Sequence, residues 1–125
     1  MDYINISVEW HKSRTWGNCP RVEVRTNDGY YTGSASGCGY DKESAAVAQA
    51  LNQSASVLKA LYDMKEQNIE KHSHDVLGYG SGYGIRPYFE GGVGISCFRS
   101  IFERLGYKWE CTGSGKTFDV YKVSR

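Results

Sequence analysis

The sequence predicts an α+β fold in which an antiparallel sheet of about five strands packs on a long helix and a shorter helix. Three observations lead to this prediction. Polar and apolar residues alternate near both ends of the chain, the middle carries helical periodicity, and short turns join the strand-like segments. The expected order is β-β-β-α-α-β-β. A chain of 125 residues fits one domain, spanning 1–125.

The N-terminal part predicts three strands. Polar and apolar residues alternate through 3–10 and again through 21–26, as in half-buried strands. A third strand is expected at 30–35, after the hairpin signal at 27–29, because Asp-Gly tolerates the backbone angles of tight turns. The polar segment 11–20 is expected to be a loop.

The middle of the chain predicts helix. One apolar stripe runs through 41–67 at helical spacing, and Asp41 is a candidate N-cap. The segment 52–56 is weak, so one helix over 41–70 and two helices with a break there are both open. A second helix is expected at 95–105, ending at Gly106.

The C-terminal part predicts two more strands, at 107–111 and 116–123. The segment between them resembles part of a phosphate-binding loop. Residues 113–117 read Gly-Ser-Gly-Lys-Thr, but the loop motif requires glycine where this chain has Glu110. The motif must also open a helix, whereas a strand pattern follows it. We therefore interpret this stretch as a strand, a turn and a strand.

Two glycine-rich segments that precede helices, 33–39 and 91–96, are better candidates for holding a nucleotide or another anion. The backbone N–H groups that begin a helix are unpaired and carry partial positive charge. The candidate residues are Gly37, Gly39, Gly92, Gly94 and Ser96, with Arg86 and Arg99 as cations. The alternative interpretation is that these glycines only allow tight connections between strands and helices.

Enzymatic, metal and cofactor functions receive little support. Cys97 falls in the first turn of a predicted helix, where a thiol pKa is lowered, but no base is located for it. An enzyme built on Cys97 is therefore a minor alternative. His72 and His74 do not have a common zinc spacing. We expect no enzyme activity, no metal and no cofactor.

The segment 71–94 is the most unusual part of the chain. It is too glycine-rich for a regular element and too aromatic for a simple linker. Tyrosine on a pliable glycine frame is typical of protein-binding loops, and Arg and Tyr dominate binding hot spots. We predict a protein-protein interface that includes loop 78–94. Its expected residues are Tyr79, Tyr83, Arg86, Tyr88, Phe89 and Trp16.

Net charge and hydropathy bear on three questions: nucleic-acid binding, membrane insertion and secretion. The net charge of +1 does not favour a strong nucleic-acid binder, although clustered cations and aromatics leave that alternative open. No apolar run approaches the roughly 20 residues of a membrane helix, and the N-terminus does not read as a secretory signal. We expect a cytoplasmic protein with no membrane partner.

The stretches SGCGYDKESAAVAQALN and GGVGISCFRSIFERLGY, read together, resemble small uncharacterised proteins of bacteriophages and mobile elements. The resemblance transfers no catalytic residue. It implies a phage-type protein in the cytoplasm of a bacterial host, with a host protein as partner. Self-association is the other expected partnership, because an exposed strand edge and aromatic loops favour it. A role in inhibiting a host defence system follows from the same resemblance.

Overall fold

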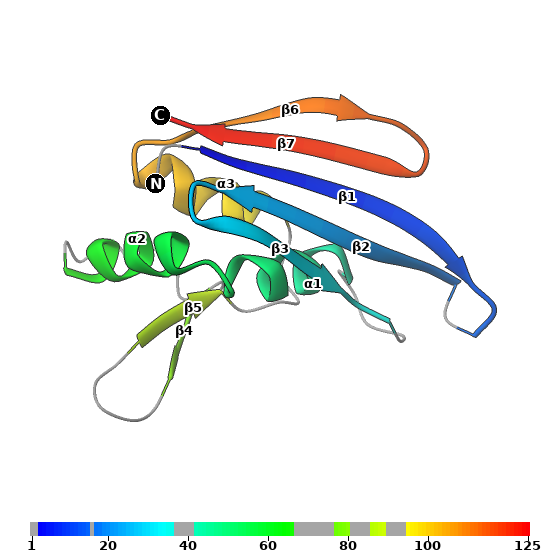
Figure 1. Ribbon diagram of the computed structural model, residues 1–125, viewed down its shortest axis with the longest axis horizontal. Helices are drawn as coiled ribbons and strands as arrows, with labels where there is room; N and C mark the ends of the chain where they lie inside the picture. Colours follow the sequence, from blue (N-terminus) through cyan, green and yellow to red (C-terminus); the bar gives the residue numbers. More distant parts are fainter. Residues whose placement is uncertain (1–2, 16, 37–41, 67–76, 81–85, 90–94) are drawn as a thin grey trace.

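The structure is a computed structural model that describes residues 3–15, 17–36, 42–66, 77–80, 86–89 and 95–125 (Figure 1). In chain order the elements are β1 (Tyr3–Ser13), β2 (Gly17–Thr26), β3 (Gly29–Ser34), α1 (Lys42–Leu51), α2 (Ala55–Glu66), β4 (Leu77–Gly80), β5 (Arg86–Phe89), α3 (Ile95–Arg104), β6 (Lys108–Ser114) and β7 (Phe118–Ser124).

The predicted antiparallel sheet of five strands is confirmed. Its strand order is β3-β2-β1-β7-β6, and each neighbouring pair is antiparallel. The three helices lie on one face of this sheet, as Figure 1 shows. The chain therefore folds as a sheet with helices on one side, which is the α+β arrangement expected from the strand and helix periods.

The core lies between this sheet and its helices. The alternation in β1 and β2 sets the buried face, because Ile6 pairs with Val24 and Val8 with Val22 in register. The helices contribute the opposite wall of the core. Its largest fully buried side chains are Phe98, Phe102, Ile4, Ile6, Leu51, Leu61, Ile101, Val8, Val22 and Val24.

The expected long helix is two helices, which decides the alternative that the sequence left open. α1 ends at Leu51 and α2 begins at Ala55. Ser54 is fully buried and caps α2, since its hydroxyl accepts a hydrogen bond from the N–H of Val57 at 3.3 Å. Ser54 lies outside both helices, but it is buried like Leu51 before it and Val57 after it. The buried face therefore continues across the break.

Two sequence expectations about loops were wrong. The segment 71–94 contains two short strands, β4 and β5, which form a separate two-stranded sheet. The expected loop 11–20 is largely strand, because β1 extends to Ser13 and β2 begins at Gly17. Cross-strand pairing supplies hydrogen bonds in both places, and this tertiary contribution outweighs weak local propensity.

The C-terminal segment confirms the interpretation of residues 113–117. β6 and β7 form a hairpin, and the N–H of Gly115 donates to the carbonyl of Phe118 at 2.9 Å to close its turn. No helix follows Lys116, so these residues lack the geometry of a phosphate-binding loop. Gly106, with φ of 87°, ends α3 as predicted.

Candidate functional site

The β4–β5 hairpin carries most of the predicted partner-binding residues. Tyr79 lies in β4, and Arg86, Tyr88 and Phe89 lie in β5, whereas Tyr83 and Trp16 lie outside the described residues. Figure 1 shows the hairpin extending from the helices on the side away from the five-stranded sheet. β5 lies close to α2 and α1. The hairpin is therefore anchored at the helical layer and is not part of the main sheet.

The register of this hairpin sorts its residues into two kinds of pair. Leu77 pairs with Phe89 and Tyr79 with Pro87, so neither member of these pairs is a glycine. In the other two pairs a glycine stands opposite a larger residue, Gly78 opposite Tyr88 and Gly80 opposite Arg86. Residues of such a pair share one face of an antiparallel ribbon. Arg86 and Tyr88 therefore occupy positions whose cross-strand neighbour has no side chain.

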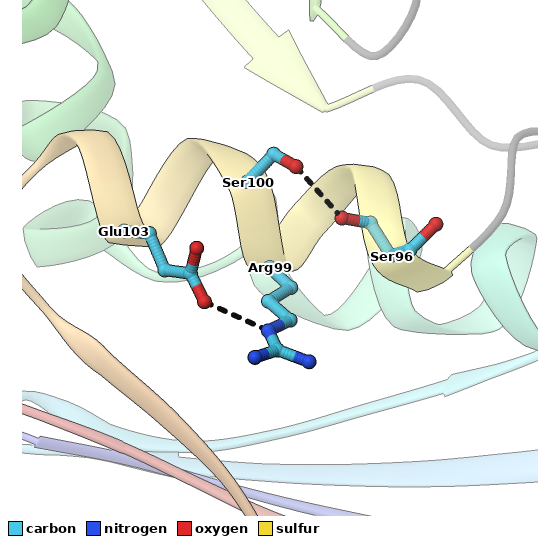
Figure 2. Close-up of polar contacts among 4 residues, drawn as sticks. All are labelled: Ser96, Arg99, Ser100 and Glu103. Carbon is cyan, nitrogen blue, oxygen red and sulfur yellow. Dashed lines mark hydrogen bonds and ion pairs between the residues drawn. The ribbon is translucent and has the colours of Figure 1, made fainter.

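The predicted anion site at α3 is only partly described. Gly92 and Gly94 lie outside the described residues, and Ser96 and Arg99 are exposed residues in the first half of α3. Figure 2 shows Arg99 directed toward Glu103, with 2.7 Å between Nε and Oε1. The Ser100 hydroxyl donates to the Ser96 carbonyl at 3.2 Å. Arg99 thus neutralises a carboxylate one turn along the helix, although an exposed pair of this kind is weak.

The predicted anion site before α1 is described only at its beginning, since Gly37 and Gly39 lie outside the described residues. Gly33 has a clear packing role, because a Cβ there would lie 2.1 Å from the carbonyl oxygen of Ala46 in α1. Only glycine allows β3 to approach α1 so closely. For Gly33, a tight connection between strand and helix accounts for the residue.

A polar groove of about 910 Å³ lies along β3 and reaches the adjoining ends of β1 and β2. Two glutamine side chains cover the outer edge of β3. Gln49 accepts a hydrogen bond from the N–H of Ser34, and Gln53 donates to the carbonyl of Thr32, both at 2.7 Å. An edge strand normally presents these backbone groups to any other strand. The glutamines occupy the positions that an added strand would use, so the groove is bounded by a protected edge.

A polar cluster that the sequence analysis missed joins the β2–β3 turn to α2. The carboxylate of Asp28 accepts hydrogen bonds from the N–H of Ser56 at 3.2 Å and from the hydroxyls of Ser54 and Ser56 at 3.0 Å. The Thr26 hydroxyl also donates to it. The sequence identified 27–29 only as a turn. The one available signal was the serine pair at 54 and 56, since serine is a common N-cap.

These contacts govern the ionisation of Asp28. Partial burial raises the pKa of the carboxyl, but the hydrogen bonds from Thr26, Ser56 and Ser54 lower that pKa more, to well below its ordinary value. The residue therefore carries its negative charge at the positive end of α2, where an anion is favoured. This arrangement ties the β2–β3 turn to the start of α2 and so stabilises the structure.

The described side chains include two cysteines and one histidine, His11. Cys19 is partly buried and Cys111 is exposed, and both are free thiols. Cys97 lies in α3, but its side chain is outside the described part of the structure, as are His72 and His74. Across the described ranges, no three His, Cys, Asp or Glu residues gather closely enough to hold a metal ion.

Two further observations concern membrane insertion and similarity to known proteins. No helix in the described part of the chain is both long and apolar enough to cross a membrane. Comparisons with protein-family models, curated proteins and solved structures give no match for this chain.

Proposed function

We propose that this protein is a non-enzymatic binding protein that engages a protein partner through segment 78–94, which contains most of the β4–β5 hairpin. The observation that carries the proposal is the separate two-stranded sheet, which extends from the helical layer away from the main sheet (Figure 1). The described residues supply no third strand to it. A two-stranded hairpin is marginally stable by itself, so a partner that adds contacts would stabilise it.

The residues and anchoring of the hairpin support protein binding over other functions. Its strands contain Tyr79 and Tyr88, a residue type that supplies a large contact area with few rotatable bonds, and Arg86, a residue type enriched in binding hot spots. β5 lies close to α2 and α1, so the base of the hairpin is already positioned before a partner arrives. Such preorganisation lowers the entropy lost on binding.

The biological part of the proposal rests on the resemblance to phage and mobile-element proteins. A host protein is the partner that this resemblance implies, and inhibition of a host defence system is the corresponding role. Self-association through the same hairpin is the alternative within this proposal.

The experiment compares two double variants of matched composition. R86A/Y88A alters the hairpin, whereas R25A/Y30A removes the same residue types from the main sheet, where Arg25 lies 5.3 Å from the centre of the Tyr30 ring. Each tagged protein is used for capture from lysate of a bacterium that carries the gene, and captured proteins are purified and titrated by calorimetry.

The proposal predicts that R86A/Y88A weakens binding to the purified partner at least about tenfold, because hot-spot residues each contribute about 2 kcal/mol or more. R25A/Y30A should bind as the unmodified protein does. Equal affinity of all three proteins for every partner would refute the proposal, provided that far-ultraviolet circular dichroism shows both variants folded.

A further inference from the structure

The two outer edges of the five-stranded sheet differ. The outer edge of β3 is covered by the side-chain amides of Gln49 and Gln53. β6 is the terminal strand at the opposite edge, and it pairs with β7 alone among the described strands. Figure 1 shows β6 along the outer margin of the sheet. The β6 edge is therefore the one at which a further strand can be added.

The backbone groups that face outward from β6 follow from the hairpin. The carbonyl of Phe118 accepts the N–H of Gly115, so the even-numbered residues of β7 direct their backbone groups toward β6. Lys122 and Ser124 are paired with Glu110 and Lys108 in that register. The backbone groups of Lys108 and Glu110 are therefore directed toward β7. Because hydrogen-bonded and non-hydrogen-bonded pairs alternate in an antiparallel ladder, the N–H and C=O groups of Trp109 and Cys111 are directed away from β7, toward the outer edge.

The charges beside these groups are self-complementary. Lys108 and Glu110 flank Trp109 and form an exposed ion pair within one strand, with 2.7 Å between Nζ and Oε1. If a second β6 pairs antiparallel with its two-fold axis at Trp109, each Lys108 lies opposite a Glu110 of the other copy. These are non-hydrogen-bonded positions, where facing side chains are closest and opposite charges attract.

Other registers lose this match. A two-fold axis at Glu110 places the two Glu110 carboxylates opposite each other, which is destabilising. An axis at Cys111 brings Glu110 opposite Thr112, where the ladder between β6 and β7 is interrupted between Cys111 and Gly113. A bulge of this kind twists an edge and limits pairing. Charge and backbone geometry therefore both select Trp109 as the centre.

We propose that a second copy of this chain adds to β6 by antiparallel strand pairing centred on Trp109, which joins two five-stranded sheets into one continuous sheet. The interface is isologous, because the same segment serves both copies. It is short and polar, so the dimer is expected to form reversibly as concentration rises. The proposal uses the edge opposite β3 and does not depend on the β4–β5 hairpin.

Charge reversal tests this dimer by analytical ultracentrifugation over a range of protein concentrations. K108E leaves β6 with two carboxylates beside Trp109 and E110K leaves it with two ammonium groups, so each variant should dimerise at least about tenfold more weakly than the unmodified protein. An equimolar mixture should restore dimerisation, since every carboxylate of the K108E copy then faces an ammonium group of the E110K copy. K116E, the same reversal in the β6–β7 turn, should leave dimerisation unchanged.

The mixture also shows that each variant is folded, which matters because E110K places a lysine opposite Lys122 in β7. An unmodified protein that is monomeric at all concentrations, or a mixture that stays monomeric, overturns the proposal. A Cys111–Cys111 disulfide formed under mild oxidation overturns the register. Pairing centred on Trp109 holds these residues about 13 Å apart at about 3.3 Å per residue, too far for such a bond.

Discussion

Removing the carboxylate of Asp28 should destabilise the protein, because this carboxylate supports the first turn of α2 together with the capping residue Ser54. The side chain accepts hydrogen bonds from the N–H of Ser56 and from the hydroxyls of Ser54, Ser56 and Thr26. D28A removes both carboxylate oxygens, so all four donors lose their acceptor. D28N keeps one side-chain oxygen but loses the negative charge. An N-cap substitution costs about 0.5–2 kcal/mol, and a charge at a helix N-terminus contributes about 0.3–1 kcal/mol.

We therefore expect D28A to lower the free energy of unfolding by about 2 kcal/mol and D28N to lower it by about 1 kcal/mol. The larger loss corresponds to a fall in Tm of about 8 °C for a domain of this size. Urea unfolding followed by circular dichroism measures both changes. Hydrogen exchange should show the earliest loss of protection in α2.

The effect of Asp28 should also depend on pH in a defined direction. The hydrogen bonds lower the pKa of Asp28 in the folded state. Its contribution to stability is therefore fully present above the unfolded pKa, about 3.9, and is lost as the pH falls through the folded value. The difference in unfolding free energy between the unmodified protein and D28N should be constant near neutral pH and should shrink below about pH 4.

The matched control is D119N, which alters a carboxylate in the β6–β7 hairpin. Asp119 accepts a hydrogen bond of 2.7 Å from the exposed Ser114 hydroxyl and lies in a strand, away from any helix N-terminus. Its loss should cost no more than about 0.5 kcal/mol. If D28A is as stable as D119N, or if α2 keeps its protection in D28A, the capping argument is wrong.

Contacts elsewhere in the structure lead to three more predictions. G33A should lower the free energy of unfolding by about 2–3 kcal/mol in urea titrations, because the new methyl group collides with α1; a loss under about 0.5 kcal/mol would contradict that collision. Q49A/Q53A should uncover the β3 edge and accelerate aggregation on heating, measured by light scattering against a Q49A single variant. If an anion binds at the start of α3, millimolar nucleotide should raise the Tm, R99A should abolish that shift, and E103Q, which frees the guanidinium, should increase it; no shift with any nucleotide would remove small nucleotides as ligands.

The candidate sites show where sequence reasoning reached its limit. Residue types identified Arg86 and Tyr88 as binding candidates, but their pairing with Gly80 and Gly78 became visible only in the β4–β5 register. The sequence indicated Arg99 as a candidate cation for an anion site, whereas in the structure Arg99 forms an ion pair with Glu103 of the same helix. Chemistry can be read from residue types, but the partner of a side chain depends on which residues the fold brings within a few ångströms.

The sequence by itself determined the fold class, the five main strands and most of the buried face. In β1 the alternation of Ile4, Ile6 and Val8 with polar residues is enough, because each side chain in a strand points to the face opposite its neighbour. Helical periodicity likewise predicted the helix at 95–105, in which Phe98 and Phe102 are fully buried. These features depend on local periodicity, which a linear sequence records directly.

Only the tertiary structure decided the features that depend on distant residues. The break between α1 and α2 is held by Asp28, which lies 28 positions before Ser56 and contacts its N–H. The strands β4 and β5 exist because they pair with each other despite their glycines. The positions of β3 and β6 at opposite edges of the described sheet depend on strand order. A hydrogen bond between distant residues leaves no periodic trace in the sequence, so its consequences appear only when the chain is folded.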